Sequence, residues 1–163
     1  PQATALLALF SVFFRCSPDP KMMTPEDAFD RYKVYLEELT VDRLRDIQSY
    51  VSENVTFQDP LHDVTGCVEM RRVFERLFAT VSDIDFHIDS HATNGRIVFF
   101  RWVLTGLLSR KSWTVEGVTR LTFDDQGMVT SHLEYWDAAS QLYDRFPVIG
   151  PVLRWLRRRV ANA

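Results

Sequence analysis

The chain has 163 residues, of which 46% are hydrophobic and 13% aromatic, and this length and composition suit one domain with a sizeable core. Its formal net charge of −3 at pH 7 argues against a nucleic-acid-binding protein, because such proteins carry an extended basic surface. The two cysteines, Cys16 and Cys67, lie in unlike surroundings without a CxxC spacing, which favours a reducing, cytoplasmic compartment over a disulfide framework.

Residues 1–22 differ from the rest of the chain. Residues 3–14 form an apolar run that is too short to span a bilayer. No basic residue precedes this run and no clear cleavage site follows it, so a signal peptide is only weakly indicated. We interpret residues 1–22 as an extension outside the core domain: a tag or an upstream segment, with export or membrane anchoring left open.

Helical patterns occupy the first half of the remaining chain. Thr24-Pro25 is followed by two acidic residues, a strong helix start because a hydroxyl caps the helix and acids favour its positive end. Apolar residues spaced three and four apart predict a helix from this point. Similar patterns predict a short second helix over about residues 42–51 and a third over about residues 68–80.

From residue 84 onward the apolar period changes from 3.6 to 2, which is typical of strands. Strands are predicted over residues 84–88, 96–108, 113–123 and 129–136. Asn94-Gly95 is a favoured two-residue hairpin signal between the first two. Three helices followed by a series of hairpins predict an α+β fold, in which a bent antiparallel sheet packs around the helices.

The stretch from Asn54 to Gly66 is the most distinctive. It begins as an alternating strand and stops at Asp59-Pro60, because proline cannot continue a ladder and holds the residue before it extended. Asp59 is therefore presented at a strand end, where it can serve a pocket as an acid or base, or simply cap a turn. His62, in the loop that follows, is either a second acid–base group or an exposed loop histidine.

The last strand places His132 and Glu134 on one face. They are either an acid–base pair used in a pocket or two groups solvated, or paired with each other, at a wet opening. No metal site is predicted, since the histidines are scattered, and no glycine-rich phosphate loop is present, so no cofactor is expected.

The chain from residue 23 to 145 resembles the nuclear transport factor 2-like (NTF2-like) superfamily, in its SnoaL-like and ketosteroid-isomerase-like branch. The motifs that carry this resemblance are Thr56-Phe57-Gln58-Asp59-Pro60, the hairpin over residues 123–131, and Glu134-Tyr135-Trp136-Asp137. The resemblance implies an NTF2-like cone with a deep apolar cavity for a small hydrophobic molecule. It also implies a homodimer formed through the outer face of the sheet.

In ketosteroid isomerases the aspartate of the Asp-Pro pair is the general base, and Asp59 matches it. A tyrosine of the first helix donates a hydrogen bond to the developing oxyanion; ungapped counting favours Tyr35, whereas a local Arg-Tyr match selects Tyr32. A second donor in those isomerases, a protonated aspartate, aligns with Thr119. Because a hydroxyl is a weaker donor, this departure argues against steroid isomerisation as such.

The resemblance thus implies a cofactor-independent isomerase, cyclase or hydrolase, with a non-catalytic binding cone as the alternative. The candidate catalytic residues are Asp59, Tyr35, Tyr32, His132 and Glu134. The candidate substrate-binding residues are Phe57, Phe78, Phe100, Trp102, Thr119 and Trp136.

Residues 146–163 predict a basic amphipathic helix after the domain. Val152, Leu153, Trp155, Leu156 and Val160 are set against four arginines. Such a helix can contact an anionic membrane surface or a partner, or it can cover the cavity or pack on the sheet with its arginines in water.

Overall fold

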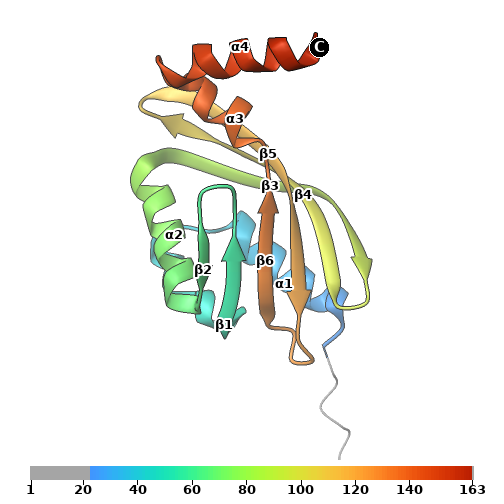
Figure 1. Ribbon diagram of the computed structural model, residues 1–163. Coiled ribbons are helices and arrows are strands. Elements are labelled where there is room, and N and C mark those ends of the chain that lie inside the picture. Colours follow the sequence, from blue (N-terminus) through green and yellow to red (C-terminus); the bar gives the residue numbers. More distant parts are fainter. Residues whose placement is uncertain (1–22, 163) are drawn as a thin grey trace, which may run out of the picture.

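The computed structural model describes residues 23–162, so the predicted extension at residues 1–22 lies outside it (Figure 1). The elements are, in chain order, α1 (Pro25–Glu37), the 3-10 helix η1 (Asp42–Ser49), β1 (Val51–Gln58), β2 (Asp63–Thr65), α2 (Cys67–Thr80), β3 (Val81–Asn94), β4 (Ile97–Leu108), β5 (Lys111–Phe123), β6 (Val129–Tyr135), α3 (Ala138–Gln141), the 3-10 helix η2 (Tyr143–Arg145) and α4 (Ile149–Ala161). The predicted order of helices followed by hairpins is confirmed, as is a helix at the C-terminal end.

The helices begin and end where local chemistry directs them. The Thr24 hydroxyl accepts a hydrogen bond from the backbone N–H of Asp27 at 3.1 Å, which caps α1 as predicted. The second predicted helix is a 3-10 helix. Its two buried residues, Leu44 and Ile47, are three positions apart, which matches the three-residue turn of that helix type.

The strands form one six-stranded sheet in the order β2-β1-β6-β5-β4-β3. The prediction of an antiparallel sheet is wrong for one pair, because β1 and β6 run parallel. No hairpin joins these two strands. The chain passes through β2, α2, β3, β4 and β5 before β6 returns beside β1, so the connection allows either strand direction. The sheet is therefore mixed, and the C-terminal ends of β1 and β6 lie next to each other.

The sheet is strongly curved around α1 and α2 (Figure 1). The pairing of β3 with β4 shifts register between Ser82 and Asp85 and again between Ile88 and Ser90, and such bulges bend a strand. The β3–β4 hairpin turns at Gly95-Arg96, one residue later than expected, with Gly95 at φ +58° in the first turn position.

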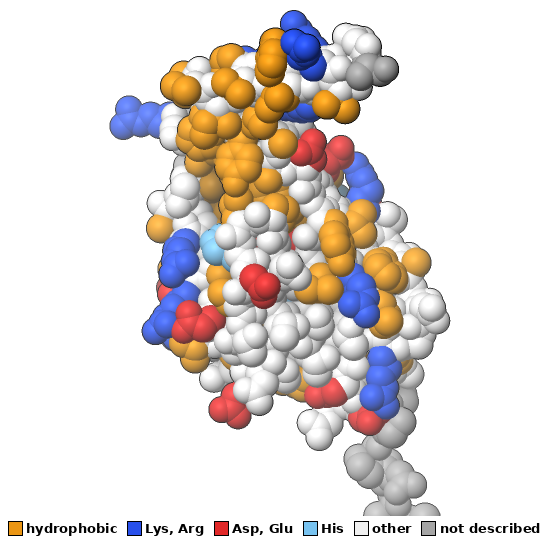
Figure 2. Space-filling model, in the orientation of Figure 1, with side chains coloured by type: hydrophobic (Ala, Val, Ile, Leu, Met, Phe, Trp, Pro, Cys, Tyr) orange, Lys and Arg blue, Asp and Glu red, His pale blue; other side chains and the backbone are white. Residues whose placement is uncertain are grey.

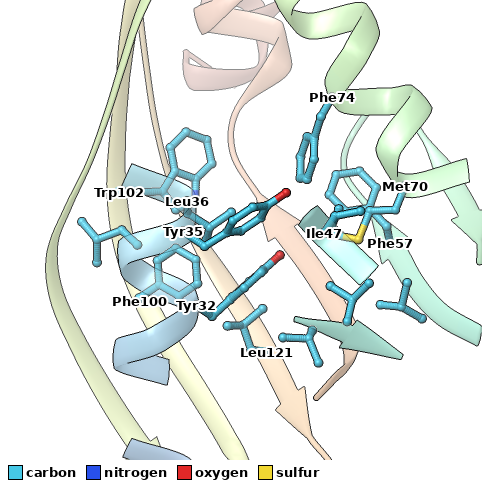
Figure 3. Packing of buried hydrophobic residues seen from close by; sticks show 14 of the residues in the cluster. Tyr32, Tyr35, Leu36, Ile47, Phe57, Met70, Phe74, Phe100, Trp102 and Leu121 are labelled. Atoms are coloured by element: carbon cyan, nitrogen blue, oxygen red, sulfur yellow. The ribbon is translucent and has the colours of Figure 1, made fainter. Parts of the chain in front are cut away.

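The core lies between the concave face of the sheet and the buried faces of α1 and α2 (Figure 3). Gly117 of β5 allows one unusually close contact there. A Cβ atom at Gly117 would lie 2.6 Å from the Trp102 ring, so only glycine lets that indole lie flat across the sheet. The Trp102 indole N–H donates to the Thr119 hydroxyl at 2.8 Å, which fixes the ring in place.

Candidate functional site

An apolar cavity of about 310 Å³ lies between α1, α2 and the concave face of the sheet. Four of the predicted substrate-binding residues line it: Phe57, Phe78, Trp102 and Trp136. Phe100 and Thr119 do not line it. Phe100 packs in the core against Phe29, with ring centroids 5.5 Å apart, and Thr119 lies behind the wall, where it accepts the hydrogen bond from Trp102.

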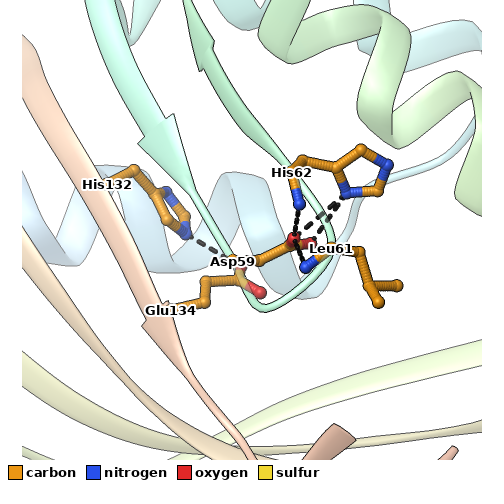
Figure 4. Close-up of polar contacts among 5 residues, drawn as sticks. All are labelled: Asp59, Leu61, His62, His132 and Glu134. Atoms are coloured by element: carbon orange, nitrogen blue, oxygen red, sulfur yellow. Dashed lines mark hydrogen bonds and ion pairs between the residues drawn. The ribbon is translucent and has the colours of Figure 1, made fainter. Parts of the chain in front are cut away.

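Six titratable side chains line the same cavity, and two of them are Glu37 and Arg76. The other four lie together near the ends of β1 and β6: Asp59, His62, His132 and Glu134 (Figure 4). Their proximity follows from the parallel pairing of β1 and β6. Gln58 of β1 pairs with Leu133 of β6. The residues that follow them, Asp59 and Glu134, therefore lie near each other at the C-terminal ends of the two strands. The mixed sheet thus brings both predicted carboxylates to one wall of the cavity.

Asp59 combines the two roles that the sequence left open. Its side chain is only 10% exposed, and its Oδ1 atom accepts hydrogen bonds from the backbone N–H groups of Leu61 at 2.7 Å and His62 at 2.5 Å. The His62 ring places Nδ1 at 3.1 Å from each carboxylate oxygen. Asp59 therefore closes the turn after β1 and also faces the cavity.

His62, which the sequence left as either a second acid–base group or an exposed loop histidine, lines the cavity beside Asp59. Because an ionised carboxylate only accepts hydrogen bonds, the proton lies on Nδ1 of His62, which leaves Nε2 as an acceptor in the neutral ring. This is the arrangement in which an aspartate orients a histidine for proton transfer. The three-residue spacing of Asp59 and His62 across an Asp-Pro turn was the available signal.

His132 and Glu134 form a second carboxylate–imidazole pair, and a tyrosine extends it inward. His132 is 1% exposed; its Nε2 lies 2.9 Å from Oε1 of Glu134 and its Nδ1 lies 3.1 Å from the Tyr32 hydroxyl. The carboxylate requires a proton on Nε2, so Nδ1 accepts and Tyr32 donates. Burial holds the pKa of Tyr32 well above its ordinary value, which keeps that hydroxyl protonated.

Glu134 is the more exposed member of this pair, and like His132 it lines the cavity. Its side chain is 16% exposed, and no hydrogen bond within residues 23–162 uses its Oε2 atom. Asp59, Glu134 and Trp136 also border a second, more open depression on the outside of the sheet edge. The two carboxylates therefore stand between the apolar cavity and a surface that exchanges protons with water.

Tyr35, the tyrosine favoured from the sequence, is directed elsewhere. It is buried, its ring stacks on Tyr50 with centroids 4.2 Å apart, and its hydroxyl lies 3.4 Å from the Arg43 carbonyl oxygen. Neither tyrosine lines the cavity directly. Of the two, only Tyr32 is hydrogen-bonded to the polar wall, through His132.

Two further observations concern residues 23–162 alone. No three side chains of His, Cys, Asp or Glu within that range are placed to hold a metal ion together. No helix in the same range combines the length and apolar character needed to cross a membrane.

Comparison with known proteins shows what this architecture is similar to. A protein-family model described as a SnoaL-like domain matches residues 32–132. A search of curated proteins finds no match.

Among solved structures, a SnoaL-like polyketide cyclase from Agrobacterium tumefaciens is 15% identical, with a TM-score of 0.58 over 71% of this chain and 93% of that one. An LEH-like epoxide hydrolase from M. tuberculosis is 12% identical, with a TM-score of 0.60 over 75% of this chain and 84% of that one. A protein with a ketosteroid isomerase-like fold from Catenulispora acidiphila, in complex with trimethylamine, is 19% identical, with a TM-score of 0.61 over 73% and 91% of the two chains. At these identities the similarity establishes the fold, which is NTF2-like.

Proposed function

The chain belongs to the SnoaL-like domain family, and from this premise we propose that it is a cofactor-independent acid–base catalyst that acts on a small hydrophobic molecule. The reaction class is isomerisation, cyclisation or hydrolysis. Structures with the same fold include proteins named as a polyketide cyclase and an epoxide hydrolase, which supports this range of chemistry without selecting one member.

One observation carries the proposal: two carboxylate–imidazole pairs line one wall of a mostly apolar cavity. An apolar cavity of this size accommodates a small, flat molecule and excludes most of the water around it. Excluding water strengthens each electrostatic interaction inside, and neighbouring acid and base groups can then move a proton in two directions. Titratable groups held in such a cavity are costly unless they are paired or used.

The contacts support a different role for each pair. Glu134 exchanges a proton with the substrate through its unpaired Oε2. The His132 N–H stabilises the carboxylate charge, and Tyr32 is a positioning residue that fixes the His132 tautomer. The other proton carrier is Nε2 of His62.

Asp59, the base implied by the family resemblance, takes a different role in this proposal. Its carboxylate already accepts hydrogen bonds from two backbone N–H groups and the His62 ring. Both of its oxygens are engaged, because the Nδ1 atom of His62 lies 3.1 Å from each. We therefore assign to Asp59 the orientation of His62, and to the pair as a whole the second proton transfer.

A base-sensitive probe tests the proposal without knowledge of the natural substrate. 5-Nitrobenzisoxazole is small, flat and apolar; a base removes its ring C–H proton, the N–O bond breaks, and a coloured cyanophenolate is released. We expect the protein to accelerate this elimination and Glu134→Gln to lower the rate by about 100-fold, the usual contribution of a positioned base. Asp63→Asn, an exposed carboxylate of β2, is the matched control and should leave the rate unchanged. Equal rates for the wild type and Glu134→Gln would contradict the proposal.

The alternative function is a non-catalytic cone that binds a hydrophobic ligand. The observation that favours it is that the turn after β1 by itself accounts for Asp59, whose Oδ1 accepts both backbone hydrogen bonds there. On this account the probe binds in the cavity without being converted. Asp59→Asn then lowers stability and leaves probe affinity as it was.

A further inference from the structure

The C-terminal helix α4 is joined to the body of the protein at one end only. It packs mainly against η2, and Figure 1 shows it lying across the end of the molecule above α3. Gly150 is buried against the backbone of Asp144, where a Cβ atom would clash, and Arg157 forms an ion pair with the Asp144 carboxylate. These contacts fix the direction in which α4 leaves the body.

Most of the apolar face of α4 is uncovered by the described residues. Ile149, Val152, Leu156 and Val160 recur at helical spacing and so share one face, and all four are exposed. Trp155 is also exposed and carries the Arg159 guanidinium 5.3 Å from its ring centre. Figure 2 shows hydrophobic side chains gathered on α4 and continuing onto the body beneath it.

Positive charge is concentrated at the same end of the molecule. Residues 138–163 contain five arginines and one aspartate, although the whole chain has a net charge of −3. Arg158 and Arg159 form no ion pair within residues 23–162. The β4–β5 turn adds exposed Arg110 and Lys111, and Arg145 ties this turn to η2 by donating to the Ser112 carbonyl at 2.6 Å.

We propose that α4 docks this end of the protein on an anionic lipid surface. An exposed apolar face flanked by arginines, with a tryptophan beside them, matches a helix that lies in the interface between lipid headgroups and acyl chains. Anionic headgroups are the partner that complements the local positive charge, which a purely apolar partner would leave unsatisfied. With 13 residues, α4 lies on the surface and does not cross it.

Docking through α4 would also give a substrate access to the cavity from the bilayer. This step rests on the proposed function. Trp113, Leu108 and Leu142 line the cavity, and the Trp113 indole N–H donates to the Gln141 carbonyl of α3 at 2.8 Å. The cavity therefore extends to the segment that carries α4. A lipophilic substrate dissolved in the bilayer would reach the cavity from this end without crossing bulk water.

Vesicle co-sedimentation of the full chain tests the docking surface. We expect binding to vesicles of phosphatidylcholine mixed with phosphatidylglycerol, weaker binding to phosphatidylcholine alone, and loss of the difference at high salt. Arg158→Gln should weaken binding to the anionic vesicles by about fivefold, the usual effect of one basic residue near such a surface. Trp155→Ser should weaken binding to both vesicle types.

Two valines of similar exposure distinguish vesicle binding through α4 from vesicle binding through any exposed apolar side chain. Val152 on α4 is 54% exposed and Val68 on α2 is 50% exposed, so Val152→Ser and Val68→Ser remove similar apolar area without disturbing the core. Only Val152→Ser should weaken vesicle binding. Equal binding of the two variants, or no binding by the wild type, would overturn the proposal. A change in the sedimentation mass of Val152→Ser without vesicles would overturn it too, by identifying a second copy as the occupant. None of these readouts depends on turnover, so failure here leaves the proposed function to its own test.

Discussion

Replacing Tyr32 by phenylalanine removes one oxygen atom from the interior and tests the hydrogen-bonded chain that supports Glu134. The ring remains, so its packing against Tyr35 and His132, each with centroids 6.0 Å away, is kept. What is lost is the donor to Nδ1 of His132, at a place where His132 is 1% exposed and water cannot replace it.

The expected magnitude follows from that burial. A buried acceptor left without its donor costs about 1–3 kcal/mol of unfolding free energy. Tyr35→Phe is the matched control, since it removes a hydroxyl of the same helix whose only hydrogen bond among the described residues is 3.4 Å long. A bond of that length is weak, and we expect its loss to cost at most about 0.5 kcal/mol.

Urea unfolding at neutral pH measures the difference between the two variants, and imidazole nitrogen NMR reports the His132 tautomer. The wild type should carry its proton on Nε2. Two results would refute the reasoning: a wild-type proton on Nδ1 of a neutral His132, or equal unfolding midpoints for Tyr32→Phe and Tyr35→Phe.

Three further predictions concern stability and assembly. Burial raises the pKa of Tyr32 above its unfolded value, so its contribution to stability is complete below about pH 10 and declines as pH rises above it; urea unfolding should show that Tyr32→Phe removes a slope of about 1.4 kcal/mol per pH unit there. Asp59→Ala leaves two backbone N–H groups of the β1 turn without their acceptor and should lower the unfolding free energy by about 1–3 kcal/mol, whereas Asp63→Ala should change it little. We also propose a homodimer through the outer face of the sheet, where Val118 and Tyr135 pair across strands and are both exposed; Tyr135→Arg should give a monomer in sedimentation equilibrium, and an unchanged mass would exclude this interface.

Local signals predicted the elements of this fold well, because each depends on residues close together in the sequence. The hydroxyl and proline at Thr24-Pro25 start α1 as expected, and alternation of apolar residues predicted the hairpin strands. The parallel pairing of β1 with β6 could not be found this way. It joins strands separated by more than 70 residues, and no turn sequence between them specifies their relative direction.

In the candidate site, too, local sequence signals identified some residues and missed the contacts between distant ones. The alternation of β6 and the Asp-Pro pair identified Glu134 and Asp59, and both line the cavity. The partners of these carboxylates were harder to predict. The choice of Tyr32 over Tyr35 depends on how α1 lies across β6. The role of His62 depends on the shape of the four-residue turn between β1 and β2.

The pH dependence of kcat/KM for 5-nitrobenzisoxazole elimination is the most direct test of proton transfer by Glu134. The account predicts activity that rises with pH as one group ionises, a rise that disappears in Glu134→Gln and persists in Asp63→Asn. A Glu134→Gln profile that superimposes on the wild type would show that the base lies elsewhere.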